Sequence, residues 1–267
     1  MKSAPKRPKA RQFLEDMAAT GRLWFDSREA QSVLGGAPAA VKVALNRLAK
    51  QGAIASPFRG FYVIVPPDYR SLGCLPADQF IPELMKSLKA PYYAGLLTAA
   101  QYHGAAHHRP QEFQVLVDKI RRPIVCGKVR VAFIARKRLR EVPMQSMNTM
   151  RGTLLVSTPE ATAFDLVGYQ NRAGGLDNVA TVLSELAEKL DPVKLVSVAE
   201  TAPLPWAQRL GYLLERVDAS DKAAPLKEYV RARAHDSAKL LPKARSKKAT
   251  RNETWKLLIN ATVEPES

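Results

Sequence analysis

The side chains in this sequence with the clearest chemical use recur at helical spacing between residues 38 and 51. The segment APAAVKVALNRLAKQ has Pro38 at a first helical position and is followed by Gly52, so we expect a helix here. Its small and apolar residues recur every three or four positions and are predicted to face inward: Val41, Ala44, Leu45 and Leu48. The predicted outward face consists of Lys42, Val43, Asn46, Arg47 and Lys50. Three of these residues are cations and none is an acid.

An outward face of this composition is suited to double-stranded DNA. A helix with its side chains is about 10–12 Å across and the major groove is about 12 Å wide, so lysine and asparagine side chains reach base edges and phosphates there. A cationic helix face on its own is typical of an ordinary solvated surface. The prediction of DNA binding therefore depends on the elements that position this helix.

A predicted β-hairpin follows the helix directly. The segments AIAS and GFYVIV have strand composition, and PFRG joins them with Pro57 and Gly60 as turn residues. Pro66 and Pro67 prevent the second strand from continuing. Arg59 at the turn is expected to contact the DNA backbone or the minor groove, and each neutralised phosphate adds about 0.9 to the salt slope of binding.

Two helices are predicted before this one. ARQFLEDMAAT places Phe13, Leu14, Met17 and Ala18 on one face, and DSREAQSVLG has Asp26 or Ser27 as N-cap with Ala30, Val33 and Leu34 inward. Three helices and a hairpin in this order are the components of a winged helix-turn-helix. The basic arm at the start lies along DNA or forms a disordered leader; it contains Lys2, Lys6, Arg7, Lys9 and Arg11.

Composition supports an anionic partner. The 267 residues carry a net charge of +16 with a pI near 10.0. The basic excess lies at the two ends of the chain. Residues 1–65 contain 11 Lys and Arg against 4 Asp and Glu, and residues 222–256 contain 11 against 3. The first residues lack a signal-peptide core, and no apolar run is long enough for a membrane span. The two cysteines, Cys74 and Cys126, form no CxxC pair, which favours a reducing cytoplasm and no thiolate metal site.

The sequence from Pro66 onward predicts a larger mixed domain. We expect helices over 78–88 and 92–103, strands over 112–119, 128–137 and 150–157, a helix capped by Thr158, and helices over 175–189, 192–201 and 204–217. Strands followed by helices indicate an α+β fold. The predicted domains are 1–66 for the winged helix with its arm, 67–221 for the mixed domain and 222–267 for a basic C-terminal extension.

No motif predicts an enzyme. His103, His107 and His108 in QYHGAAHHRP form the strongest metal candidate, but Gly104 is expected to end the helix between them, which favours a capping or surface role. The dipeptide Gly-Ser, with which a nucleotidyltransferase site begins, is absent, as are a G-x-S-x-G elbow and a phosphate-binding glycine loop. We therefore predict no catalytic residue, no metal and no cofactor.

Several segments in order resemble the AbiEi family of abortive-infection antitoxins, the antitoxin half of type IV toxin–antitoxin pairs used in phage defence. They are the winged-helix start, YYAGLLTAAQYHG, VSTPEATAFDLV and WAQRLGYLLERV, and the resemblance covers roughly residues 10–217. It implies an autorepressor that binds inverted repeats in its own promoter as two copies. It also implies an antitoxin domain that counteracts a nucleotidyltransferase-like toxin without a stable complex. By position, the DNA-binding residues would be Lys42, Val43, Asn46, Arg47, Lys50 and Arg59.

Three alternatives stay open. The basic run at 243–251 is either a phosphate-binding element or a disordered tail, and the residues from Trp255 to Ile259 either dock on the body or remain free. In WAQRLGYLLERV the apolar stripe of Leu210, Leu213, Leu214 and Val217 belongs to the core or to a partner-binding helix, with Arg209 outside it. The whole protein is either a DNA-binding antitoxin or a winged-helix adaptor for RNA or a protein partner.

Overall fold

The computed structural model describes residues 9–105, 111–246 and 249–265. By its internal contacts the chain divides into two units: unit 1 comprises Met1–Ala90, Arg121–Phe133 and Asn148–Thr153, and unit 2 comprises Pro91–Ile120, Ile134–Met147 and Leu154–Ser267. Helices and several sheets occur together, so the fold is α+β. Among the described helices, none has the length and apolar character that a membrane span requires.

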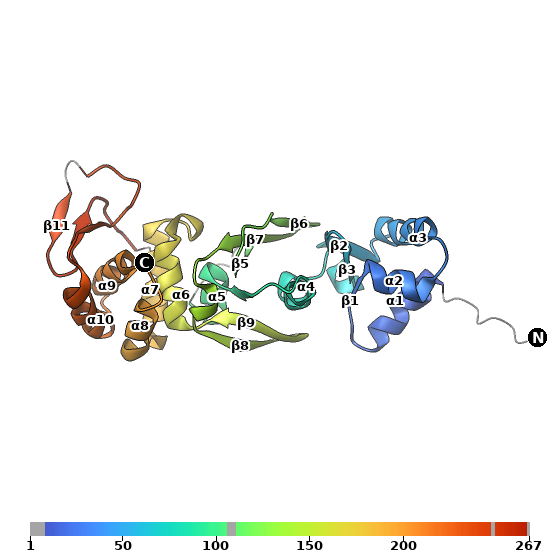
Figure 1. Ribbon diagram of the computed structural model, residues 1–267, viewed down its shortest axis with the longest axis horizontal. Coiled ribbons are helices and arrows are strands. Elements are labelled where there is room, and N and C mark those ends of the chain that lie inside the picture. Colours follow the sequence, from blue (N-terminus) through green and yellow to red (C-terminus); the bar gives the residue numbers. More distant parts are fainter. Residues whose placement is uncertain (1–8, 106–110, 247–248, 266–267) are drawn as a thin grey trace, which may run out of the picture. The chain divides into compact units, whose positions relative to one another are not determined.

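Unit 1 begins with three helices and a three-stranded antiparallel sheet, drawn in blue in Figure 1. The elements are α1 (Ala10–Ala19), β1 (Trp24–Asp26), α2 (Ser27–Leu34), α3 (Pro38–Lys50), β2 (Ile54–Phe58) and β3 (Phe61–Ile64). The sheet order is β1-β3-β2, with Trp24 opposite Val63 and Ile54 opposite Ile64. The three helices and the hairpin are confirmed, whereas β1 was missed because three residues are too few to show strand periodicity.

One apolar face of each helix builds the core of this part of unit 1. Phe13 of α1 meets Phe25 of β1 edge to face, with ring centroids 5.2 Å apart, and Val63 of β3 is completely buried. The inward prediction for Val33 is wrong, since its side chain is 42% exposed. The eight-residue helix α2 buries only Ala30 and Leu34, one turn apart, which leaves Val33 outside that narrow stripe.

Unit 1 also contains α4 (Ile81–Ser87), β6 (Ile124–Cys126) and the start of β7 (Val129–Ala135). The two cysteines, distant in sequence, form a buried hydrogen-bonded thiol pair. The shared hydrogen bond raises the pKa of Cys74 and lowers that of Cys126. Gly127 has φ +57°, and a Cβ there would lie 2.1 Å from the Leu72 carbonyl oxygen, so only glycine permits this close approach.

A six-stranded sheet has the order β6-β7-β5-β4-β9-β8, and its remaining strands are β4 (Tyr92–Ala94), β5 (Phe113–Val117), β8 (Met144–Thr149) and β9 (Gly152–Ser157). Strand β4 pairs antiparallel with β5 and parallel with β9. The helix predicted over 92–103 is wrong in its first turn. Residues 92–94 form β4, and α5 (Leu96–Tyr102) begins only after Gly95, where a Cβ would lie 2.4 Å from Leu116 Cδ1.

The helices of unit 2 surround α6 (Pro159–Gly168), which packs against α5, α7 (Leu176–Leu186), α8 (Pro192–Ala199) and α9 (Leu204–Arg216) (Figure 1). Every residue from Glu160 to Val167 is buried, so α6 has no solvent-facing stripe. The predicted N-terminus is confirmed, because the Thr158 hydroxyl accepts a hydrogen bond from Ala161 N at 3.3 Å and Pro159 occupies the first turn.

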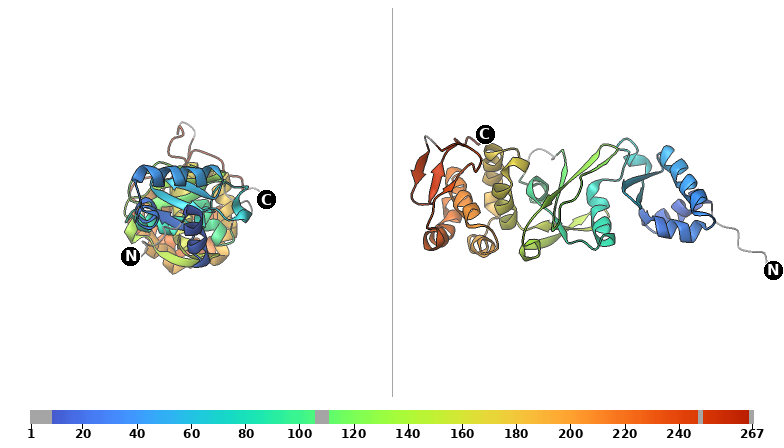
Figure 2. Two further views of the ribbon diagram at one scale, coloured as in Figure 1. Left: turned by 90° about the vertical axis from the view of Figure 1, so that its right-hand side faces the viewer. Right: turned by 45° about the horizontal axis from the view of Figure 1, so that its top comes forward.

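The described part of the C-terminal region is folded. Helix α10 (Ser220–Arg233) is followed by a small sheet of β10 (Ala238–Lys239), β12 (Leu257–Ile259) and β11 (Thr250–Asn252), in that order, which Figure 2 shows beside α9 and α10. Trp255 is completely buried, so this segment docks on the body.

The prediction that Arg209 lies outside the packed face of α9 is wrong. Its side chain is 8% exposed, and its Nε donates to the Lys239 carbonyl at 2.8 Å. Lys247 and Lys248 lie outside the described residues.

Candidate functional site

The predicted outward face of α3 is exposed in unit 1. Val41, Leu45 and Leu48 are buried, and this fixes the rotation of the helix. All five residues of the predicted reading face are exposed on the opposite side: Lys42, Val43, Asn46, Arg47 and Lys50. Among the described residues, none of these side chains forms a hydrogen bond or an ion pair within the chain. Val43, which is 59% exposed, adds an apolar contact surface among the polar groups.

Arg59 lies exposed in the turn between β2 and β3. The turn is shorter than predicted, because Pro57 and Phe58 belong to β2 and a register shift between Ala55 and Phe58 accommodates them. Gly60 has φ +77°, and its carbonyl accepts a hydrogen bond from Ser27 N at 2.9 Å. This bond connects the turn that carries Arg59 to the first residue of α2.

Helix α2 is itself fixed at the same end. The Asp26 carboxylate accepts hydrogen bonds from Arg28 N and Glu29 N, both at 2.8 Å, so Asp26 is the N-cap of the two candidates, Asp26 and Ser27. Of the basic arm, Lys9 and Arg11 are described, and Arg11 forms an exposed ion pair with Glu15 at 3.7 Å. Lys2, Lys6 and Arg7 lie outside the described residues.

The histidine segment is only partly described, since His107 and His108 lie outside the described residues. His103 caps the C-terminus of α5 and is 3% exposed, and its Nε2 donates to the Ser157 carbonyl at 2.8 Å. Burial lowers the pKa of His103, against the effect of that hydrogen bond. Its ring is therefore part of the packing between α5 and the end of β9.

Unit 2 contains a buried ionic cluster that sequence reasoning missed. Arg136 Nε lies 3.2 Å from Asp165 Oδ1, and the two side chains are 2% and 0% exposed. The Tyr93 hydroxyl donates to Asp165 Oδ2 at 2.7 Å. Burial raises the pKa of the Asp165 carboxyl to about 6, although Arg136 and the Tyr93 hydroxyl both act to lower it. The guanidinium of Arg136 stays charged, because the nearby carboxylate raises its pKa despite burial.

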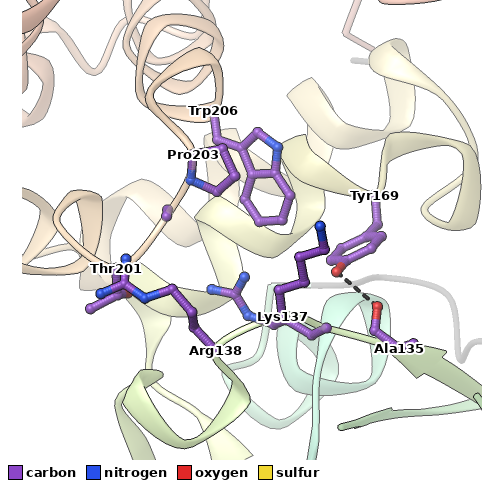
Figure 3. A pocket seen from close by; sticks show the side chains of 9 residues that line it. Ala135, Lys137, Arg138, Tyr169, Thr201, Pro203 and Trp206 are labelled. Carbon is purple, nitrogen blue, oxygen red and sulfur yellow. Dashed lines mark hydrogen bonds between the residues drawn. The ribbon is translucent and has the colours of Figure 1, made fainter. Parts of the chain in front are cut away.

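A pocket opens beside this cluster (Figure 3). It is lined by the end of β7 and the residues after it, by the residue that follows α6, and by the segment that leads into α9: Ala135, Arg136, Lys137, Arg138, Tyr169, Thr201, Ala202, Pro203 and Trp206. The Tyr169 hydroxyl donates to the Ala135 carbonyl at 3.1 Å, and the Tyr169 and Trp206 rings meet edge to face at 5.3 Å. The pocket thus combines aromatic walls with three consecutive cations.

One sequence signal could have indicated the cluster. Asp165 is the single acid in the otherwise apolar or small run ATAFDLVG, and Arg136 directly follows the apolar strand segment VAFIA. A charge inside an apolar element needs a buried partner. Which charge partners which was not readable, because 29 positions and a change of secondary structure separate the two residues in sequence.

Comparison with protein families gives one match. Residues 93–216 match the model of the AbiEi antitoxin C-terminal domain, a segment that holds the ionic cluster and every residue that lines the pocket. No curated protein sequence matches the chain at a significant level.

Two solved structures are similar to this one. The crystal structure of the RV2827C protein from Mycobacterium tuberculosis has a TM-score of 0.67 at 16% identity and covers 95% of this chain and 92% of its own, which shows a shared fold. An antigenic nucleotidyltransferase-like protein from Paracoccidioides brasiliensis has a TM-score of 0.36 at 12% identity, over 57% of this chain and 90% of its own, a likeness too weak to bear on fold or function. By the family match, residues 93–216 of this chain form an AbiEi antitoxin C-terminal domain.

Proposed function

We propose that residues 1–66 form a winged helix-turn-helix that binds double-stranded DNA, and that the protein represses its own promoter. The observation that carries the proposal is the outer face of α3: its cations and amide are exposed, unpaired among the described residues and free of acid. The three helices and the antiparallel sheet in the order β1-β3-β2 supply the positioning scaffold. Residues 67–221 would then form the antitoxin domain and residues 222–267 its basic extension.

The chemistry of the α3 face favours sequence readout. An asparagine such as Asn46 can form a bidentate pair with adenine, and a lysine or arginine can pair with guanine. Exposed cations such as Lys50 contribute phosphate contacts, which add affinity without sequence information. Arg59 projects from the β2–β3 turn, which serves as the wing and reaches the adjacent backbone or minor groove.

Binding to inverted repeats requires two copies of the protein on the DNA. Two recognition helices that read the same groove face must be about 34–36 Å apart, or a multiple of that distance. We propose that two copies bind together on the DNA, with one α3 face on each half-site.

We propose that the AbiEi domain counteracts a nucleotidyltransferase-like toxin encoded beside this gene, without forming a stable complex with it and without catalytic activity of its own. The family match supports this assignment. A function on promoter DNA in an abortive-infection system places the protein in the cytoplasm.

The DNA half is tested by fluorescence anisotropy of the purified protein on its own upstream DNA, with a scrambled duplex of equal length as control, over a series of salt concentrations. Specific binding is typically about 10³–10⁷ tighter than non-specific binding. Equal affinity for both duplexes, with a steep salt slope, would reject the repressor and favour an adaptor that uses generic charge. The antitoxin half is tested by co-expression with the adjacent reading frame, where restored growth is the expected result and unrelieved toxicity contradicts it.

A further inference from the structure

We propose that the pocket of unit 2 binds a small anion that carries a planar ring, and that free nucleoside monophosphates are the chemical class that fits it. This site is separate from the α3 face, and the proposal does not depend on DNA binding. It stands on the size of the cavity, the charge of its lining and the fixed positions of its aromatic walls.

The cavity has the size of a small-ligand site. Its volume is about 430 Å³, within the range of roughly 300–1,000 Å³ usual for such sites. It is lined by Ala202 and Pro203 on the side of α9 and by Tyr169 and Trp206 as aromatic walls. A mostly apolar cavity with a few convergent polar groups is the usual form of a cofactor or metabolite site.

Three consecutive cations, Arg136, Lys137 and Arg138, make the lining of the pocket positively charged. Arg136 is 3% exposed, its Nε pairs with the Asp165 carboxylate at 3.2 Å, and its guanidinium lies over the Trp206 ring, 5.2 Å from the centroid. Arg136 therefore holds the indole wall in place and adds positive charge beside the cavity. No acidic side chain lines the pocket.

Lys137 supplies the uncompensated charge. It is exposed, it has no acidic partner among the described residues, and Figure 3 shows its side chain reaching toward the rings of Tyr169 and Trp206. Arg138, by contrast, is held by the Glu141 carboxylate and by the Glu200 carbonyl, the latter at 3.2 Å. Lys137 is therefore the cation most available to a phosphate.

The aromatic walls are fixed before any ligand binds. The Trp206 ring lies against Gly168, where a Cβ would be only 2.4 Å from the indole, and the Tyr169 hydroxyl is held by the Ala135 carbonyl. Rings in fixed positions suit stacking with a nucleobase, because every base presents a π-face. Preorganised walls also reduce the entropy that binding would otherwise cost.

The backbone around the pocket is consistent with an anion site. Arg138 has φ +54° and ψ +34°, a left-handed conformation that non-glycine residues adopt rarely. The segment that leads into α9 contributes Pro203, the N-cap, and α9 has no side-chain cap, so the positive end of its dipole lies at this wall. The charge of Lys137 and the helix terminus therefore act in the same direction.

The test is isothermal titration calorimetry of the full chain with adenosine and uridine monophosphates, the matching nucleosides, inorganic phosphate and a single-stranded oligonucleotide of about ten bases. We expect saturable one-to-one binding of a monophosphate that is at least about tenfold tighter than that of its nucleoside or of phosphate, because both walls then contribute. Lys137→Ala should weaken it about tenfold, and Ala202→Phe, which fills the cavity, should abolish it. Lys227→Ala removes an exposed lysine of α10 that does not line the pocket, and it should change nothing.

Thermal melts of each variant verify that it is folded, and both pocket substitutions are at partly or fully exposed positions, so a loss of binding reports on the pocket. The absence of saturable binding by every monophosphate would overturn the proposal. So would equal binding by wild type, Lys137→Ala and Ala202→Phe. Binding of the oligonucleotide alone, with loss in the pocket variants, would reject a free nucleotide and assign the pocket to a nucleic-acid strand.

Discussion

The indole of Trp255 lies directly on the backbone of Gly211: a Cβ at Gly211 would come within 2.0 Å of the ring atom Cζ3. The indole is completely buried, and its Nε1 donates to Glu215 Oε2 at 2.8 Å. One residue without a side chain in α9 therefore provides the surface on which the C-terminal segment docks. The basic tail is thus anchored to the AbiEi domain by an aromatic ring.

Gly211→Ala is expected to lower the free energy of unfolding by about 1–3 kcal/mol, because the new methyl overlaps the indole. Without the overlap, the same change in a helix would stabilise by up to about 1 kcal/mol, so the two explanations differ in sign. Urea denaturation measures the difference. In a Trp255→Leu background the cost should largely disappear, and an undiminished cost there would show that the overlap with Trp255 is not its cause.

Asp165→Asn is expected to remove a pH dependence of stability. The folded protein holds the Asp165 proton more tightly than the unfolded chain, since burial raises its pKa from 3.8 to about 6. This contribution to stability is full below about pH 4 and is lost as the pH rises through about 6, an effect of roughly 3 kcal/mol.

The measurement is the free energy of unfolding of wild type and Asp165→Asn at several pH values between about 4 and 7. Relative to the variant, wild type should lose stability as the pH rises. Asp221→Asn, at an exposed position of α10, controls for the loss of one negative charge. A constant difference between wild type and Asp165→Asn over this range would contradict the assigned pKa.

The elements with long periodic patterns were predictable from sequence, and the very short ones were not. Helix α3 and its buried face followed from Val41, Leu45 and Leu48 at helical spacing, with Pro38 at its start. Strands β1, β4 and β6 have three residues each and are specified by their neighbours in a sheet. Tyr92–Ala94 is a strand because it pairs with β5 and β9, a contact that no local pattern encodes.

The candidate sites differ in the same way. The α3 face lies in one continuous helix, so periodicity alone separated its buried and exposed residues. The pocket draws on residues 135–138, 169 and 201–206, which only the tertiary fold brings together. Arg209 shows the converse error, since a charge predicted to lie outside the apolar stripe of its helix is covered by a small sheet whose strands lie about 30 to 50 residues later in the chain.

Arg59→Ala is expected to weaken binding to native and scrambled duplexes by a similar factor. A phosphate contact carries no sequence information, so its loss should reduce the slope of log affinity against log salt by about 0.9 on both duplexes. Anisotropy titrations at four or more salt concentrations measure the slope. Arg140→Ala, an exposed arginine of unit 2, is the matched control. An unchanged slope would remove Arg59 from the interface.

The most direct test of the central claim, that the outer face of α3 reads DNA sequence, is the ratio of affinities for native and scrambled duplexes in the Asn46→Ala variant. Asn46 is exposed and has no partner within the described chain, so its loss leaves the fold intact. A lost bidentate base contact costs about 1–3 kcal/mol of discrimination. We predict that the ratio falls by roughly 5- to 150-fold in Asn46→Ala and is preserved in Arg59→Ala. An unchanged ratio in Asn46→Ala would contradict the assignment of this residue to base recognition, and unchanged ratios in both Asn46→Ala and Lys42→Ala would contradict the reading role of α3.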